Sequence, residues 1–273
     1  MSDLLDVSNV STCFRSPTGW TEVLHQASFS VRSQEIVGIV GESGSGKSTA
    51  VRSILGLLPV GGNVVEGRAF FDGEDLLACG RKRIRELRGR RIGFVAQNPF
   101  GALNPVLKLS AQFAAIFRAH GLSFGRGERE RVLALLAQTG IAEPERVLKG
   151  YAFELSGGMA QRVVIAMAII LEPALVIADE PTTALDLTVQ RQVLNVFRDL
   201  TVMSGRSALI VTHDLGLVAH YCDRVIVMLK GRVVETGDAV DLLTNPQHPY
   251  TQRLLSSLRV AAQADEVASH GIR

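Results

Sequence analysis

Ile36-Val37-Gly38-Ile39-Val40 leads directly into Gly41-Glu42-Ser43-Gly44-Ser45-Gly46-Lys47-Ser48-Thr49, and this stretch decides the fold. The apolar run is typical of a buried parallel strand, and a helical pattern follows the loop over residues 49–58. Glycines let the loop turn tightly enough for successive N–H groups to converge on phosphate oxygens, and the helix N-terminus adds partial positive charge. The spacing therefore predicts a phosphate-binding loop, in which Lys47 contacts the β- and γ-phosphates and Ser48 coordinates Mg²⁺. Its expected binding residues are Gly41, Ser43, Gly44, Ser45, Gly46, Lys47, Ser48 and Thr49.

Other apolar runs are expected to join this strand in one parallel sheet, at residues 92–96, 175–178 and 208–211. Shorter runs at residues 4–7, 27–31 and 68–71, with polar turns at residues 16–19 and 72–73, predict an antiparallel sheet. Residues 225–229 and 232–235 flank Lys230-Gly231 and predict a hairpin. Together these patterns predict an α/β fold.

The stretch over residues 105–158 has no strand-like run and carries helical periodicity, for example at Val132, Leu135 and Leu136. We interpret it as a helical insertion within the α/β core. The expected organisation is one domain over residues 1–273. Residues 1–97 and 159–240 form the core with its antiparallel β subdomain, residues 98–158 the helical insertion, and residues 241–273 a C-terminal tail.

Two carboxylates follow the apolar run at residues 175–178, namely Asp179 and Glu180. Ligands of α/β sheets bind at the carboxyl ends of the parallel strands, so these acids are expected beside the phosphate loop. Asp179 is a candidate Mg²⁺ ligand, and Glu180 is a candidate base that polarises the attacking water. The alternative interpretation is an ordinary solvated strand end.

Composition narrows the functional classes. The chain has 273 residues, 47% of them hydrophobic and 21% charged, which is typical of a globular protein. The net charge of +2 is too small to give the whole surface a positive potential that would attract a polyanion, so nucleic acid is not the expected partner. The longest apolar run, at residues 163–171, is much shorter than the about 20 residues of a membrane-spanning helix. The first residues show no secretory signal, so we expect a cytosolic location.

Leu155-Ser156-Gly157-Gly158-Met159-Ala160-Gln161-Arg162 resembles the signature sequence of ATP-binding cassette (ABC) ATPases. Gln97 matches the Q-loop glutamine of that family, Ala184-Leu185-Asp186 the D-loop, and His213 the switch histidine. The resemblance covers nearly the whole chain. It implies an ATPase that uses ATP and Mg²⁺, with a phosphate-loop (RecA-like) parallel-sheet core, an N-terminal antiparallel β subdomain and an inserted α-helical subdomain.

The resemblance also implies roles for single residues. Lys47, Gln97, Glu180 and His213 are the expected catalytic residues; Gln97 joins Ser48 and Asp179 on Mg²⁺, and His213 donates a hydrogen bond to the γ-phosphate. Further nucleotide contacts are expected at Ser156, Gly157, Gly158 and Asp186, which complete the site of a partner ATPase subunit. Ser156 is alternatively an ordinary helix cap. Phe14 is expected to stack on adenine, the alternatives being Trp20 or a packing role.

The tail sequence Asn245-Pro246-Gln247-His248-Pro249-Tyr250-Thr251-Gln252-Arg253-Leu254-Leu255 resembles that of importer ATPases in the oligopeptide, dipeptide and nickel group. Residues 181–190 resemble the first of the two paired ATPases of that group. By that likeness, two ATPase subunits lie beneath two permeases at the cytoplasmic face of the inner membrane, and an external solute-binding protein delivers the solute.

Three functions stay open at this point. Peptide import is the first expectation because His248-Pro249-Tyr250 is intact, and nickel import is the alternative because no cysteine follows Cys222. A non-transport ABC ATPase acting on nucleic acid or the ribosome is disfavoured, because the chain has no sustained heptad run and no second phosphate loop. The basic cluster over residues 81–91 is a solvated face or lies near the membrane, and no site is assigned to it.

Overall fold

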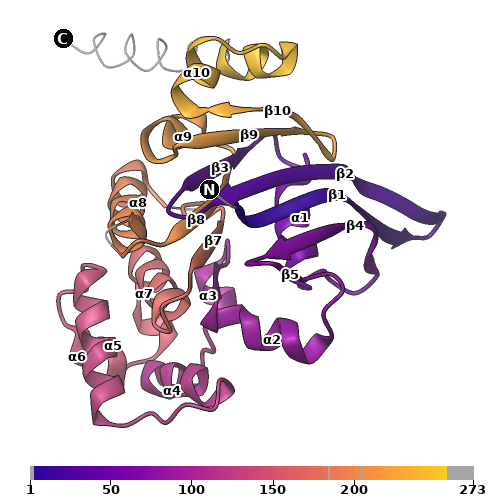
Figure 1. Cartoon of the computed structure of the whole chain (residues 1–273). Helices are drawn as coiled ribbons and strands as arrows, with labels where there is room; N and C mark the ends of the chain where they lie inside the picture. Colours follow the sequence, from indigo (N-terminus) through magenta and orange to yellow (C-terminus); the bar gives the residue numbers. More distant parts are fainter. Residues whose placement is uncertain (1–2, 184, 203, 257–273) are drawn as a thin grey trace, which may run out of the picture.

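The computed structural model describes residues 3–183, 185–202 and 204–256, and it contains two sheets with helices packed around them (Figure 1). The antiparallel sheet has the strand order β2-β1-β4-β5. Its strands are β1 (Asp3–Ser16), β2 (Gly19–Arg32), β4 (Gly62–Phe71) and β5 (Glu74–Asp75). The predicted strands at residues 4–7, 27–31 and 68–71 lie within them but are too short. Next to their turn, residues 13–16 of β1 pair with residues 19–22 of β2; these ends of the strands are half-buried or exposed, and no continuous apolar run marks them.

The second sheet has the order β10-β9-β3-β8-β7-β6, in which β10 alone among the described strands runs antiparallel to its neighbour. Its strands are β3 (Ile36–Val40), β6 (Ile92–Val95), β7 (Leu175–Asp179), β8 (Ser207–Thr212), β9 (Arg224–Leu229) and β10 (Arg232–Asp238). Every residue of β3, β7 and β8 is buried, which explains their continuous apolar sequence. The predicted hairpin is present, with Lys230 and Gly231 both at positive φ.

The first helix differs from its prediction. It was expected over residues 49–58, whereas α1 spans Lys47–Ile54. It begins earlier because Gly46, at φ 99°, turns the chain directly into the helix. It ends earlier because Gly56, at φ 61°, and Pro59 interrupt the helical pattern.

The other helices cover the sheets and their edges (Figure 1). Between β6 and β7 lie α3 (Pro99–Ala102), α4 (Leu109–Ala119), α5 (Arg126–Gln138), α6 (Pro144–Lys149), η1 (Ala152–Glu154) and α7 (Gly157–Ile169). Elsewhere are α2 (Arg81–Arg90), α8 (Leu187–Val202), α9 (Leu215–Tyr221), α10 (Ala239–Thr244) and a helix over residues 249–256. The exact bounds of the helical insertion, 98–158, stay a prediction, as do those of the tail, whose residues 257–273 lie outside the described residues. No helix in the described ranges combines the length and the apolar character needed to span a membrane.

Three apolar clusters hold these layers together. One fills the space between the antiparallel sheet, α1 and one face of the second sheet. Another joins the opposite face to α4, α5, α7 and α8, and a third packs α9, α10 and Tyr250 against β3 and β9. Since β3, β6, β7 and β8 run parallel, their carboxyl ends meet at one edge of the sheet. The candidate site lies at this edge.

The basic cluster forms α2, which carries a kink at Arg88 and Gly89. Arg83 pairs with Glu74, and Arg91 pairs with Asp72. Arg88 also lines a groove of about 770 Å³ between α1, β4 and α2. None of these contacts reaches the phosphate loop.

Candidate phosphate-binding and catalytic site

The phosphate loop connects β3 to α1, and two of its glycines have backbone geometry that other residues rarely adopt. Gly41 has φ 155°, and a Cβ atom there would collide with the carbonyl oxygen of Met228 on β9. Gly46 has φ 99°, and a Cβ atom there would lie 3.2 Å from the Cα atom of Gly231. The loop is therefore folded tightly against the β9–β10 hairpin, and α1 begins immediately after it.

Lys47 lies inside the loop, with 4% of its surface exposed. Its Nζ donates hydrogen bonds to the carbonyl oxygens of Gly41, at 2.7 Å, and Glu42, at 2.9 Å. Burial lowers the pKa of Lys47, and the carboxylates of Glu180 and Asp179 partly oppose this shift. The side chain is thus held among the loop's own backbone, close to the acidic end of β7.

Ser48 and Asp179 lie in direct contact. The Ser48 hydroxyl, in the first turn of α1, donates to Asp179 Oδ1 at 2.6 Å, and Arg52 pairs with Oδ2 at 3.0 Å. Asp179 is fully buried at the end of β7. A hydroxyl and a carboxylate oxygen, together with the amide oxygen of Gln97, form an all-oxygen donor set, which is the kind that Mg²⁺ prefers. The chemistry of these side chains therefore fits the predicted ion.

Glu180, which follows β7, lies close to side chains that follow the two neighbouring strands β6 and β8. Its Oε2 accepts hydrogen bonds from Gln97 Nε2, which follows β6, at 2.8 Å and from the Thr183 hydroxyl at 2.9 Å. Nδ1 of His213, which follows β8, lies 3.8 Å from Glu180 Oε1. Glu180 has φ 48°, a strained backbone geometry of a kind found at functional sites. The structure thus brings three of the predicted catalytic side chains together.

The residues of the signature sequence and of the D-loop line a cavity that is separate from the phosphate loop. Ser156 caps α7 by accepting a hydrogen bond from Met159 N at 3.3 Å, and Asp186 accepts one from Val189 N at 2.9 Å near the start of α8. A Cβ atom at Gly158 would lie 2.7 Å from Val189 Cγ1, so glycine permits the close approach of α7 and α8. These residues line a cavity of about 470 Å³, to which no described residue of the phosphate loop contributes. Ala184, from the same D-loop motif, lies outside the described residues.

Phe14 is half-buried on β1, opposite Thr21 and Gly62. A Cβ atom at Gly62 would lie 2.7 Å from the Phe14 ring, so the ring packs on this glycine. Trp20 is 62% exposed near the β1–β2 turn. Adenine stacking stays a prediction for Phe14, and the other site roles also stay predictions.

We expect Phe14→Ala to weaken ATP binding about ten-fold or more, because stacking a base on an aromatic ring contributes about 1–3 kcal/mol. Phe14→Tyr keeps the ring and should bind ATP like the unchanged chain. Trp20→Ala tests the alternative aromatic residue. Titration with a fluorescent ATP analogue measures all three; equal affinity in the Phe14→Ala variant would assign Phe14 to packing alone.

Three residues of this region have no role in the sequence-based prediction. Arg52 follows Ser48 by one helical turn, so the i, i+4 spacing was a usable signal for its contact with Asp179. Thr183 follows Glu180 by three residues and forms a local hydrogen bond. Tyr250, whose hydroxyl accepts from Glu42 N at 3.0 Å, is 208 residues away, and no local pattern predicts that contact.

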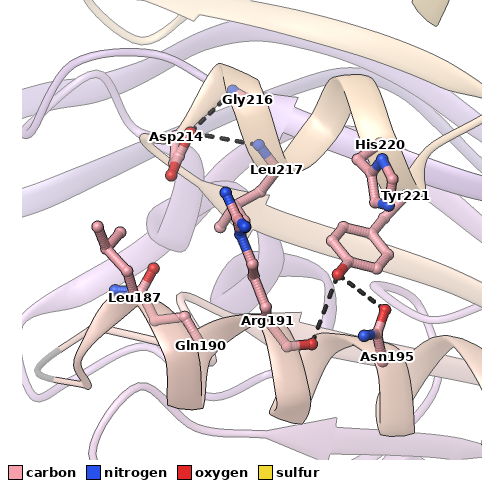
Figure 2. A pocket seen from close by; sticks show the side chains of 9 residues that line it. All are labelled: Leu187, Gln190, Arg191, Asn195, Asp214, Gly216, Leu217, His220 and Tyr221. Atoms are coloured by element: carbon pink, nitrogen blue, oxygen red, sulfur yellow. Dashed lines mark hydrogen bonds between the residues drawn. The ribbon is translucent and has the colours of Figure 1, made fainter. Parts of the chain in front are cut away.

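A further cavity, of about 450 Å³, lies between α8 and α9 (Figure 2). Several of its polar groups already have partners: Asp214 caps α9 by accepting from Gly216 N at 2.8 Å, and the Tyr221 hydroxyl donates to Asn195 Oδ1 at 2.9 Å. We assign no chemistry to this cavity.

A phosphate loop between a buried parallel strand and a helix, with carboxylates at the end of a nearby strand, defines the P-loop class of nucleotide-binding α/β proteins. Residues 24–183 match the family model described as "ABC transporter", and residues 234–272 match the one described as "Oligopeptide/dipeptide transporter, C-terminal region". The chain belongs to the ABC transporter family and is an ATPase. The predicted family, fold class and activity are therefore confirmed.

Relatives and solved structures agree with this assignment. The chain is 46% identical over 255 residues to the "Peptidoglycan transport ATP-binding protein YejF" of Agrobacterium fabrum, covering 93% of this chain and 47% of the relative's length. It is 42% identical to the "Dipeptide transport ATP-binding protein DppD" of Bacillus subtilis, covering 94% of this chain and 77% of that protein. The cassette MJ0796, solved as a dimer bound to ADP and Pi, superposes with a TM-score of 0.76 at 27% identity, covering 86% and 98% of the two chains.

Proposed function

We propose that this chain is the ATP-hydrolysing subunit of an importer that takes up dipeptides or oligopeptides. The match of residues 234–272 to the C-terminal region of oligopeptide and dipeptide transporters carries this proposal. The name of the Bacillus subtilis relative supports the same solute class. Nickel or another metal chelate is the alternative solute for the same mechanism.

The catalytic site is proposed to be shared between two ATPase subunits. The separation of the signature cavity from the group around Lys47 supports this, since one chain presents two half-sites. The solved dimer of the related cassette supports it as well. In this arrangement Ser156, Gly157 and Gly158 of one subunit face the nucleotide bound at the phosphate loop of the other.

The residues would divide the work of hydrolysis as follows. Lys47 and the loop N–H groups bind the β- and γ-phosphates, and Mg²⁺ bound by Ser48, Asp179 and Gln97 supplies positive charge against them. Glu180 accepts a proton from the attacking water, and Gln97 and Thr183 hold its carboxylate in place. His213, which is 60% exposed on its side chain, is free to donate a hydrogen bond to the γ-phosphate.

The permeases are proposed to dock on the helical part beside Gln97. Apolar side chains are exposed there on α3, on the loop after it and on η1, namely Phe100, Val106, Leu107 and Phe153. Gln97 precedes α3 by two residues, so a change at Glu180 can move this surface through a single side chain. This docking places the chain at the cytoplasmic face of the membrane, with an external solute-binding protein delivering the solute.

Transport by reconstituted vesicles tests the proposed function. We expect vesicles containing this chain, its partner ATPase and both permeases to take up a radiolabelled dipeptide only with enclosed ATP and added binding protein. Phe100→Glu should abolish uptake and leave ATP-analogue binding unchanged, because it charges the docking surface. Val240→Glu, a matched change of an exposed apolar side chain on α10, should leave uptake intact.

Uptake of chelated nickel without uptake of peptides would assign the chain to the alternative solute. Failure of the chain to associate with vesicles that carry the permeases would contradict the importer role itself. It would favour the non-transport class of ABC ATPases.

A further inference from the structure

The C-terminal tail returns to the phosphate loop. The hydroxyl of Tyr250 accepts a hydrogen bond from the backbone N–H of Glu42, the second residue of the loop, at 3.0 Å. Tyr250 is 4% exposed, so water competes little for this contact. Figure 1 shows the C-terminal helices beside β10 and α9, on the side of the second sheet away from the helical insertion.

Packing fixes the ring that carries this hydroxyl. Tyr250 belongs to an apolar cluster with Val40, the last residue of β3, and with Leu215 and Val218 of α9. Val40 directly precedes the phosphate loop, and Leu215 follows His213 by two residues. The ring is therefore buried in the same cluster as the end of the strand that enters the loop and the helix that follows His213.

The residues before Tyr250 are also held in place. Glu235 on β10 accepts hydrogen bonds from the backbone N–H groups of Gln247, at 2.7 Å, and His248, at 3.2 Å. The His248 Nδ1 atom in turn accepts one from Tyr250 N at 3.1 Å. Pro249 suits the start of the helix over residues 249–256, because it has no N–H group that needs a partner. The segment before Tyr250 thus fixes where its hydroxyl lies.

The contact acts on one peptide unit of the loop. The N–H of Glu42 and the carbonyl of Gly41 belong to the same planar peptide group. Tyr250 bonds its N–H, and Lys47 Nζ bonds its oxygen at 2.7 Å. Gly41, at φ 155° and without a Cβ atom, offers little steric resistance to rotation of this group. The Tyr250 hydroxyl therefore opposes that rotation from the side away from Lys47.

We propose that Tyr250 is a positioning residue of the nucleotide site, which holds the Gly41–Glu42 peptide in the orientation that receives Lys47. The C-terminal tail then sets the affinity of the phosphate loop for nucleotide, since a preorganised loop spends less free energy on ordering when ATP binds. Burial raises the pKa of Tyr250, so the hydroxyl stays neutral at physiological pH and the contact does not titrate there. The inference rests on nucleotide binding at the loop and not on the identity of the solute.

A pair of hydroxyl deletions tests this proposal in the full chain. Tyr250→Phe removes the contact and keeps the ring. Tyr221→Phe is the matched control: Tyr221 is also buried, and its hydroxyl bonds Asn195 at 2.9 Å, away from the loop. With a fluorescent ATP analogue and Mg²⁺ as the probe, we expect Tyr250→Phe to raise the dissociation constant about five- to ten-fold. Tyr221→Phe should change it less than about two-fold, at a similar loss of thermal stability.

Amide hydrogen exchange of Glu42 tests whether the Tyr250 hydroxyl holds this N–H in solution. Exchange at this N–H should be slow in the unchanged chain and in Tyr221→Phe, and clearly faster in Tyr250→Phe at matched global stability. The proposal is overturned if the two variants bind the analogue equally well, or if Glu42 exchanges at the same rate in both. Absence of nucleotide binding by the unchanged chain would instead overturn the ATPase assignment, and this inference with it.

Discussion

Replacing Glu180 with Gln is expected to lower the rate of ATP hydrolysis about 10²- to 10⁴-fold while leaving ATP binding intact, because it removes the proposed general base and little else. The amide has the shape of the carboxylate, and its oxygen can still accept from Gln97 and Thr183. The Ser48–Asp179 contact does not involve Glu180, so these two proposed Mg²⁺ ligands are left unchanged. The variant should accumulate in the ATP-bound state.

Phosphate release and equilibrium binding of an ATP analogue measure the two halves of this expectation separately. Light scattering should show that the Glu180→Gln variant forms an ATP-dependent dimer that lasts longer than the dimer of the unchanged chain. Glu172→Gln is a matched control, since Glu172 is exposed and pairs with Arg131. Hydrolysis at the rate of the control, or loss of binding together with hydrolysis, would assign Glu180 a different role.

Much of the group around Glu180 could be predicted from local sequence. The loop, Asp179 with Glu180, and His213 each lie at the carboxyl end of a buried apolar strand, and parallel strands bring these ends to one edge of the sheet. Gln97 follows its strand by two residues and reaches the same edge. Short spacing and strand direction together therefore place these side chains without any knowledge of long-range contacts.

The remaining features depend on contacts that no local pattern records. The ends of β1 and β2 next to their turn are held by pairing with each other, and no continuous apolar run in the sequence marks them. The bond between Tyr250 and Glu42 joins residues 208 positions apart. For Phe14, the family motif predicts that the ring stacks on adenine, and the structure adds a contact that the motif does not predict, the packing of the ring on Gly62.

Replacing Lys47 with Ala is expected to weaken ATP binding at least about 100-fold, because two charge-assisted contacts to phosphate are worth about 3 kcal/mol. The loss also removes the positive charge inside the loop that offsets the repulsion of phosphate by Asp179 and Glu180, while Arg52 still pairs with Asp179. Titration of the isolated chain with an ATP analogue measures the change. Lys149→Ala, which removes an exposed lysine paired with Glu145, should bind like the unchanged chain.

This variant also tests whether the site is shared between subunits. Lys47→Ala and Ser156→Arg chains should each be inactive alone, because every dimer of either has a lesion in both sites. In a mixed dimer both lesions fall in one site, and the other combines an intact Lys47 with an intact Ser156. Random pairing makes half of the dimers mixed, so about a quarter of the unchanged activity should return.

A self-contained site predicts no recovery of activity on mixing, since neither variant chain holds all of the residues of its own site. A shared site in the self-dimer would therefore be contradicted if mixing restored no activity and the specific activity of the unchanged chain stayed constant over a hundred-fold dilution. Repeating the mixing with the partner ATPase would then show whether the shared geometry or only the choice of partner was wrong.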